Sequence, residues 1–313
     1  MNELIATDHV LRFCLRAVRQ RAFQVQLALL VLLCAGVTAF GQTDGPKRIA
    51  YIHGDIAADG TLPSGEKPAY HKMLLTDSGK TGLSQFREMV EAEGYVIEQY
   101  YDRETTLDQA FLEKHAVLIF GLHQKLWSEA EKEALDSWLK AGGGMLIYSD
   151  SASGGHFGQV GAQNPVGQRV VNNLITQYGM QVTRDQANGV KAYRADPDEP
   201  HPLMKGRPVL EGEGVSPVAI HPESGARALI PYRDDPRNKV HGAPHIRNRE
   251  GVTFESPQFA ALALRTVGKG HVIVMFDRQP MWNGGPGSDI GKRDNKEILR
   301  RVIRFLGPTR RTR

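Results

Sequence analysis

Histidine and aspartate residues follow several of the most apolar runs of the chain, and their side chains are the ones that could do chemistry. The runs at 48–53, 144–150 and 271–277 end in polar residues, and polar residues follow the run at 116–121 within three positions. In an open parallel sheet, ligands bind at the carboxyl ends of the strands. The sequence therefore predicts a ligand-binding site made of the following strand-end residues: His53, Asp55, His123, Asp150, Asp277, Arg278, Trp282 and Asn283.

Some of the same residues could bind a divalent metal ion, because imidazole nitrogens and carboxylate oxygens are metal ligands. This interpretation takes His53, Asp55 and His123 as ligands, with either Asp150 or His156 completing the set. The chain has no close-spaced ligand pair of the HExxH kind, so these ligands would have to converge from separate loops. The sequence itself predicts no cofactor, and a divalent metal stays as an alternative.

The stretch YSDSASGG at 148–155 follows an apolar run and could present a nucleophile. Ser151 or Ser153 would then be the catalytic residue, with His156 and Asp150 close by in the sequence. The stretch does not have the G-x-S-x-G pattern of a nucleophile elbow. Turns rich in serine and glycine are also common after strands without any chemistry. These residues are therefore weaker candidates for catalysis than the strand-end set is for binding.

Apolar strands that alternate with amphipathic helices must position these side chains. The alternation predicts an α/β fold with a mainly parallel sheet covered on both faces, and the less regular 180–265 region adds antiparallel strands. Ser128 and Glu131 predict a capping box for one helix, and Asp294 and Glu297 predict another for the last helix. The expected helices lie at 83–94, 128–142, 164–179 and 294–306, and the expected strands at 48–53, 96–101, 116–121, 144–150 and 271–277.

The first 41 residues have the features of an export signal. Four arginines precede an apolar segment at 22–41, whose length suits a signal peptide better than a full membrane span. An uncleaved N-terminal anchor is the alternative, and in both cases the rest of the chain is expected in the periplasm or outside the cell. One domain at 45–308 follows, and 309–313 form a basic tail that we expect to be disordered.

Composition and cysteine usage restrict the function. The formal net charge is +4, but much of the excess lies at the two ends, and no basic stripe with interleaved aromatic residues predicts a nucleic-acid partner. The only cysteines are Cys14 and Cys34, both in the first 41 residues. The domain at 45–308 therefore has no cysteine for a nucleophile, a disulfide or a zinc–thiolate site.

Four motifs in a fixed order carry a resemblance that extends over about 47–306. They are AVLIFG, then LWSEAEKEALDSWLKAGGGMLIYSD, then HPLMKG, then GKGHVIVMFDRQPMWN. Together they resemble the class I glutamine amidotransferase-like superfamily, in its non-amidotransferase branches of ThuA-like proteins and the GldG-type bacterial domain. The resemblance implies a flavodoxin-like three-layer α/β sandwich. It implies no glutaminase activity, because the elbow at 150–154 has no cysteine, and it gives His201 a structural role in a His-Pro turn.

The sequence thus predicts an exported, non-catalytic, amidotransferase-like domain that binds a small carbohydrate-type ligand or a protein partner in the cell envelope. Trp282 would be a sugar-stacking platform or a lid over the core. The alternative is an exported hydrolase, or another carbohydrate-active enzyme, that uses strand-end His and Asp residues with or without a metal. Membrane contact is expected only through residues 22–41, and only if that segment is not cleaved.

Overall fold

The structure is a computed structural model of the full chain, and it describes residues 47–54, 73–121, 125–148, 167–182, 187–198, 201–233, 245–247, 253–255, 258–285 and 287–307. All of these residues belong to one compact unit, Pro46–Arg313. No helix in these ranges is both long enough and apolar enough to cross a bilayer. The predicted signal segment at 22–41 lies outside the described residues.

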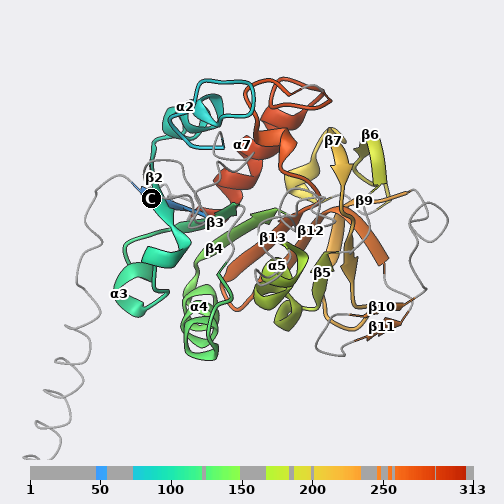
Figure 1. Ribbon diagram of the computed structural model, residues 1–313. Coiled ribbons are helices and arrows are strands. Elements are labelled where there is room, and N and C mark those ends of the chain that lie inside the picture. The colour runs from blue at the N-terminus through green and yellow to red at the C-terminus, as the bar shows by residue number, and fades with distance from the viewer. Residues whose placement is uncertain are drawn as a thin grey trace, which may run out of the picture. The chain divides into compact units, whose positions relative to one another are not determined.

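A nine-stranded sheet forms the centre of the fold (Figure 1), and five of its strands run parallel. Their order in space is 2-1-3-4 followed by β13, which is the order of flavodoxin-like doubly wound sheets. The core strands of this group are buried on both faces, as their continuous apolar sequences predict. The five parallel strands are β1 (Lys47–His53), β2 (Tyr95–Tyr101), β3 (Val117–Gly121), β4 (Gly144–Tyr148) and β13 (Gly270–Met275).

Four antiparallel strands extend the sheet beyond β13. The long strand β12 (Gln258–Val267) pairs with β13, and it also pairs with β8 and β9. These strands come from the 180–265 region, which confirms the predicted antiparallel addition. The remaining three strands are β5 (Met180–Val182), β8 (Val218–Ile220) and β9 (Arg227–Pro231).

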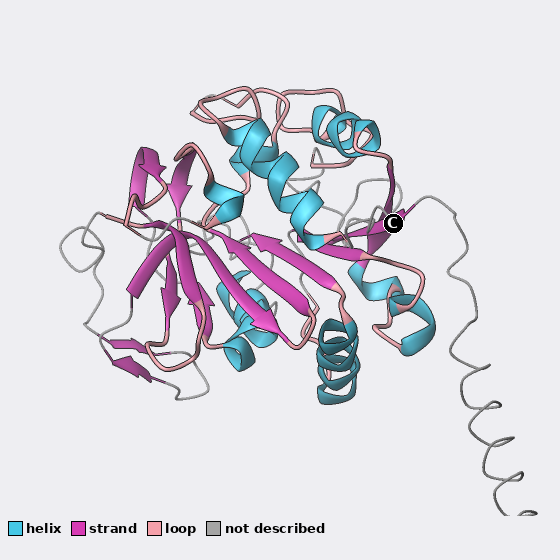
Figure 2. Ribbon diagram, turned by 180° about the vertical axis from the view of Figure 1, so that it is seen from behind, coloured by secondary structure: helices cyan, strands magenta, loops and turns pink. Residues whose placement is uncertain are grey.

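Helices cover both faces of the sheet, so the fold has three layers (Figures 1 and 2). Helices α2 (Ser84–Ala92) and α7 (Asn295–Leu306) pack on one face. On the other face lie α3 (Gln109–Leu112), α4 (Glu129–Ala141) and α5 (Gly167–Ile175). The predicted fold class, a flavodoxin-like sandwich with a mainly parallel sheet, is therefore confirmed.

The start and the end of helix α4 both follow from its sequence. The Ser128 hydroxyl accepts a hydrogen bond from the Glu131 backbone, and the Glu131 carboxylate accepts one from the Ser128 backbone, which completes the predicted capping box. The helix ends at Gly142, whose φ of 126° is available to glycine at little energetic expense. These end signals fix where β4 begins and therefore where its carboxyl end lies.

Two strands that the sequence did not predict, β6 (Ala187–Arg194) and β7 (Val209–Val215), form an antiparallel pair. Apolar residues of this pair join the core on the α2 and α7 side of the sheet. A second small pair is formed by β10 (His245–Arg247) and β11 (Thr253–Glu255). The β6–β7 pair extends the α2–α7 layer over the antiparallel half of the sheet.

The capping box predicted for the last helix is wrong in its contacts. Asp294 does occupy the N-cap position of α7, but its Oδ2 accepts a hydrogen bond from the Val209 backbone at 2.8 Å and makes no cap bond. Glu297 instead forms ion pairs with Arg300 and Arg301 on its own helix. The Val209 donor, at the start of β7, competes successfully for the Asp294 carboxylate.

Candidate functional site

The predicted site residues divide into those that the structure describes and those that it does not. His53, Asp277, Arg278, Trp282 and Asn283 are described. The others lie outside the described residues: Asp55, His123, Asp150, Ser151, Ser153 and His156. The predicted nucleophile turn and most of the predicted metal ligands are therefore untested by the geometry.

Strands β1, β3, β4 and β13 end at one edge of the sheet, as the prediction requires. His53 pairs with Gly121, and Met275 pairs with Tyr148, so their carboxyl ends are in register. Strand β1 pairs with β2 on one side and β3 on the other, which makes this the switch point in the strand order where open α/β sheets bind ligands. Side chains alternate along β1, so His53 points to the same face as Tyr51, toward the α2 and α7 layer.

His53 is the predicted residue that lies at this switch point. Its side chain is fully buried, and its Nδ1 lies 2.9 Å from the carbonyl oxygen of Gly54. Burial lowers the pKa of His53 to about 4, so the imidazole is neutral at physiological pH. Its Nε2 has no hydrogen-bond partner among the described residues. A buried polar atom without a partner requires an explanation, and a bound water, ion or ligand is a usual one.

Tyr51 lies beside His53, with 5.8 Å between the ring centroids, and it pairs with Tyr148. Sequence reasoning missed both tyrosines because tyrosine in an apolar strand resembles core. The hydroxyl oxygens of Tyr51 and Tyr148 are 3.0 Å apart, and Tyr51 also bonds the Met73 carbonyl oxygen at 3.2 Å. Burial, followed by the proximity of Tyr148, raises the pKa of Tyr51 well above its usual range. Gly121 makes this pair possible, because a Cβ there would lie 2.2 Å from the Tyr148 hydroxyl.

Arg278 lies over the indole ring of Trp282, with 5.2 Å between the guanidinium carbon and the ring centroid. Its positive charge slightly offsets the rise in the Tyr51 pKa, so the guanidinium lies within electrostatic reach of the tyrosine pair. Trp282 is only 7% exposed and packs in the core formed with α2 and α7. Of the two roles predicted for Trp282, this burial favours a lid over the core.

Asp277 is buried and helps to hold the fold together. Its Oδ2 accepts a hydrogen bond from the Glu213 backbone at 2.9 Å, and its Oδ1 accepts one from the Arg278 backbone at 2.7 Å. Gly212 permits this approach, because a Cβ at that position would lie 2.7 Å from Oδ2. The carboxylate therefore attaches β7 to the end of β13.

Asn283 likewise bonds only to protein groups. Its Oδ1 accepts hydrogen bonds from the backbone of Gln85 at 2.8 Å and the hydroxyl of Ser84 at 3.4 Å. Its Nδ2 donates to the carbonyl oxygens of Asp77 and Gly79, each at 2.9 Å. The amide thereby caps helix α2, which lacks a side-chain cap of its own.

The two described members of the predicted His/Asp set do not meet at one point. Strands β1 and β13 are separated by β3 and β4, so His53 and Asp277 are at least roughly 14 Å apart, at a spacing of about 4.8 Å per strand. Among the described residues, no group of three His, Cys, Asp or Glu side chains is arranged to hold a metal ion. The geometry therefore places His53 with the tyrosine pair, and Asp277 with β7.

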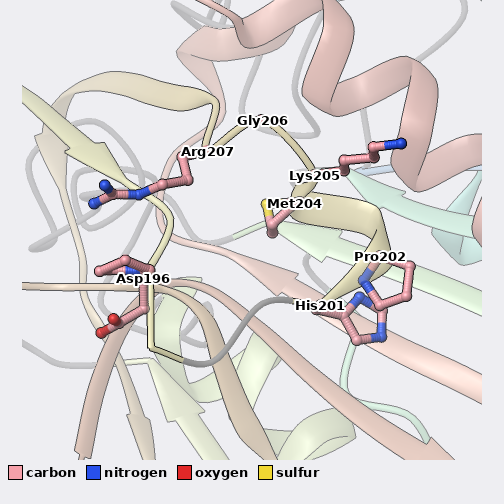
Figure 3. Close-up of a pocket in the computed structure, with 8 residues that line it drawn as sticks. Asp196, His201, Pro202, Met204, Lys205, Gly206 and Arg207 are labelled. Atoms are coloured by element: carbon pink, nitrogen blue, oxygen red, sulfur yellow. The ribbon is translucent and has the colours of Figure 1, made fainter.

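A surface pocket of about 480 Å³ lies elsewhere, around the short 3-10 helix η3 (Pro202–Met204) (Figure 3). His201 lines it and also caps η3, since its Nδ1 accepts a hydrogen bond from the Leu203 backbone at 3.3 Å. Lys205 and Arg207 extend to opposite sides of the turn, so the pocket does not direct its charged groups toward one point (Figure 3). The predicted structural role of His201 agrees with this cap.

These features define an α/β domain of the flavodoxin-like class with a polar cluster at the carboxyl edge of its parallel strands. The sequence matches the DUF4350 family, described as a domain of unknown function, over residues 76–303, and the chain belongs to that family. No curated protein matches the sequence.

Solved structures show similarity at low sequence identity. A ThuA-like protein from Bacteroides uniformis is 13% identical, with a TM-score of 0.49, and the match covers 86% of this chain and 94% of that one. The N-terminal domain of mmIFT52 is 14% identical, with a TM-score of 0.49, covering 83% of this chain and 97% of that one. A cytoplasmic protein from Salmonella typhimurium is 12% identical, with a TM-score of 0.48, covering 83% and 100%.

Proposed function

We propose that this chain is a non-catalytic binding domain that takes a small carbohydrate-type ligand at the carboxyl edge of its parallel strands. The observation that carries the proposal is the buried Nε2 of His53, which has no partner among the described residues at the switch point of the sheet. Sugars offer both hydrogen-bond donors and acceptors, which suits a cluster of imidazole and phenol groups. The proposal also places the chain in the non-amidotransferase part of the amidotransferase-like superfamily.

Binding is favoured over hydrolysis by the state of the two described candidates for acid–base chemistry. An efficient general base has a pKa near the working pH, whereas burial lowers the pKa of His53 to about 4. Asp277 accepts hydrogen bonds from two backbone N–H groups of the fold and lies three strand spacings away from His53. A neutral imidazole with a bare nitrogen is better suited to accepting a ligand hydrogen than to removing a proton.

A thermal-shift titration of the full chain with neutral hexoses tests the proposal. A ligand that binds only the folded state, at a hundred times its Kd, adds about 2.7 kcal/mol of stability. For a domain of this size, that corresponds to a rise in Tm of about 5–10 °C. The rise must begin at millimolar sugar and grow with the logarithm of the sugar concentration, because stabilisation by solute exclusion needs far higher concentrations. A flat Tm across the sugars would refute the proposed ligand class.

The same titration separates binding from the alternative, an exported carbohydrate-active enzyme. A binding domain returns the sugar chemically unchanged, whereas a hydrolase of oligosaccharides releases reducing ends over time. Disaccharides incubated with the chain should therefore release no new reducing ends, whether or not they raise the Tm. Release of reducing ends that the His53→Asn substitution abolishes would establish the enzyme instead.

We further propose that the chain is exported through its first 41 residues. The supporting observation is the arginine-rich start followed by the apolar segment at 22–41. Mass spectrometry of the chain recovered from the periplasm tests this, with cleavage expected after Ala39 or Gly41. Recovery of the intact chain from the cytoplasm alone would refute export.

A further inference from the structure

The imidazole of His53 has one nitrogen that is bonded to the protein and one that is not. A carbonyl oxygen can only accept, so the contact between Nδ1 and the Gly54 oxygen places the hydrogen on Nδ1. The neutral ring then has a bare lone pair at Nε2, which can accept a hydrogen bond and cannot donate one. The tautomer that the backbone selects therefore makes His53 an acceptor toward any bound molecule.

A fully buried acceptor at Nε2 destabilises the folded chain unless a donor forms a hydrogen bond with it. An apolar or shorter side chain at the same position would avoid that penalty. The position also lies between Tyr101 on β2 and Gly121 on β3, at the switch point of the strand order. An unsatisfied acceptor and a topological ligand site are independent observations, and they coincide at the end of β1.

The neighbouring phenols do not supply the missing hydrogen. The Tyr51 hydroxyl bonds the Met73 carbonyl oxygen, which can only accept, so the Tyr51 hydrogen is directed there. Tyr148 is consequently the donor in its contact with Tyr51. Both phenol hydrogens are thus committed to these contacts, and the group that reaches Nε2 must bring its own.

We infer that the ligand proposed above donates an O–H hydrogen bond to Nε2 of His53, so that the site selects hydroxyl-bearing compounds such as sugars and other polyols. The inference rests on the proposed function, since it names a contact that this ligand makes. A compound of the same shape whose oxygens can only accept would leave Nε2 unsatisfied. It should bind about tenfold more weakly, the effect of losing one hydrogen bond.

Two substitutions separate the two nitrogens. His53→Asn keeps an N–H near the Nδ1 position, for the bond to the Gly54 carbonyl, and removes the acceptor at Nε2. His53→Gln places an amide oxygen near the Nε2 position and keeps an acceptor there. The probes are D-glucose, D-galactose and D-mannose, with fully O-methylated D-glucose as the control that has the same ring and no O–H donor.

The full chain is titrated with each probe by thermal shift and by calorimetry. We expect at least one hexose to bind the wild type and the His53→Gln variant, and to bind His53→Asn about tenfold more weakly. A purely structural histidine would leave the hexose affinity of His53→Asn unchanged, whatever the Tm of that variant, and would overturn the inference.

Other outcomes separate the inference from the function on which it rests. If O-methylated glucose binds as well as D-glucose, the inference is wrong and the proposed carbohydrate binding stands. If no hexose binds the wild type, the proposed function and the inference both fail. If Zn²⁺ raises the Tm of the wild type and not of His53→Asn, and no sugar changes the Tm, then Nε2 is a metal ligand. The proposed function and the inference are then both overturned.

Discussion

Replacing Asn283 with alanine should destabilise the fold, although the sequence marks this residue as a ligand-binding candidate. The amide orientation is fixed by its partners, since the Gln85 backbone N–H can only donate and the Asp77 and Gly79 carbonyls can only accept. The substitution removes the bond that caps α2 and both bonds that hold the loop before that helix. It also removes a weak contact with the Ser84 hydroxyl at 3.4 Å.

The size of the effect follows from these contacts. Loss of a helix cap typically destabilises a protein by about 1 kcal/mol. Each of the two bonds to carbonyl oxygens contributes about 1 kcal/mol, and less where water can replace the lost donor. We neglect the contact with Ser84 because of its length. The sum is about 2–3 kcal/mol, which corresponds to a fall in Tm of about 5–10 °C for a domain of this size.

Calorimetric melting of the wild type, Asn283→Ala and Ser84→Ala checks this value. Ser84→Ala is the matched control, since it deletes only the long contact to the same amide and should change the Tm by less than about 1 °C. An Asn283→Ala variant that melts with the wild type would show that the amide does not hold α2, and would refute the reasoning. If that variant also lost sugar binding, the ligand role predicted from the sequence would be the correct one.

The remaining predictions concern the carboxyl edge of the sheet. On acidification from pH 7 to 5, the wild type should lose about 2 kcal/mol more stability than His53→Gln in urea unfolding. The imidazole of the unfolded chain binds a proton below about pH 6.5, while the buried imidazole, with a pKa of about 4, stays neutral. Equal losses would show that His53 is not buried and neutral. Gly121→Ala should lower the Tm by several degrees through collision with the phenols of Tyr51 and Tyr148, and an unchanged Tm would contradict their placement. Asp277→Asn should destabilise the fold by about 2 kcal/mol in the same unfolding assay, since the new NH₂ group must face a backbone N–H donor, whereas a loss below about 0.5 kcal/mol would contradict the two bonds.

The parallel half of the fold could be predicted from sequence because its signals are local. Continuous apolar runs mark β3 and β4, and Ser128 and Gly142 mark the two ends of the helix between them. Strand β7 could not be predicted in the same way, because its sequence VLEGEGV contains glutamates and glycines, which are more typical of a turn. Its glycines are needed for packing, since Asp277 lies against Gly212.

For the candidate site, the sequence predicts which polar residues lie at strand ends, but not the contacts that their side chains make. The position of His53 at a strand end could be predicted, because this residue ends an apolar run. The partners of Asn283 could not be predicted, because Gln85 lies 198 positions away in the sequence and nothing in its local sequence indicates the contact. Tyr51 and Tyr148 were missed for a different reason, since only the paired hydroxyls distinguish them from ordinary core residues.

Hydrogen-bond accounting separates structural from functional polar residues at this edge of the sheet. Asp277 and Asn283 have polar side chains at strand ends, but their oxygens and nitrogens bond to backbone groups that the fold must satisfy in any case. His53 differs from these two, because one of its nitrogens bonds to the backbone and the other has no partner in the described part of the chain, and the buried Nε1 of Trp282 likewise has none. Selection for stability alone would remove such an atom, since proteins tolerate local penalties mainly where function requires them. The strand order, which does not depend on the side-chain contacts of His53, places the ligand site at the same end of β1. This agreement makes His53 the residue on which the function should be tested first.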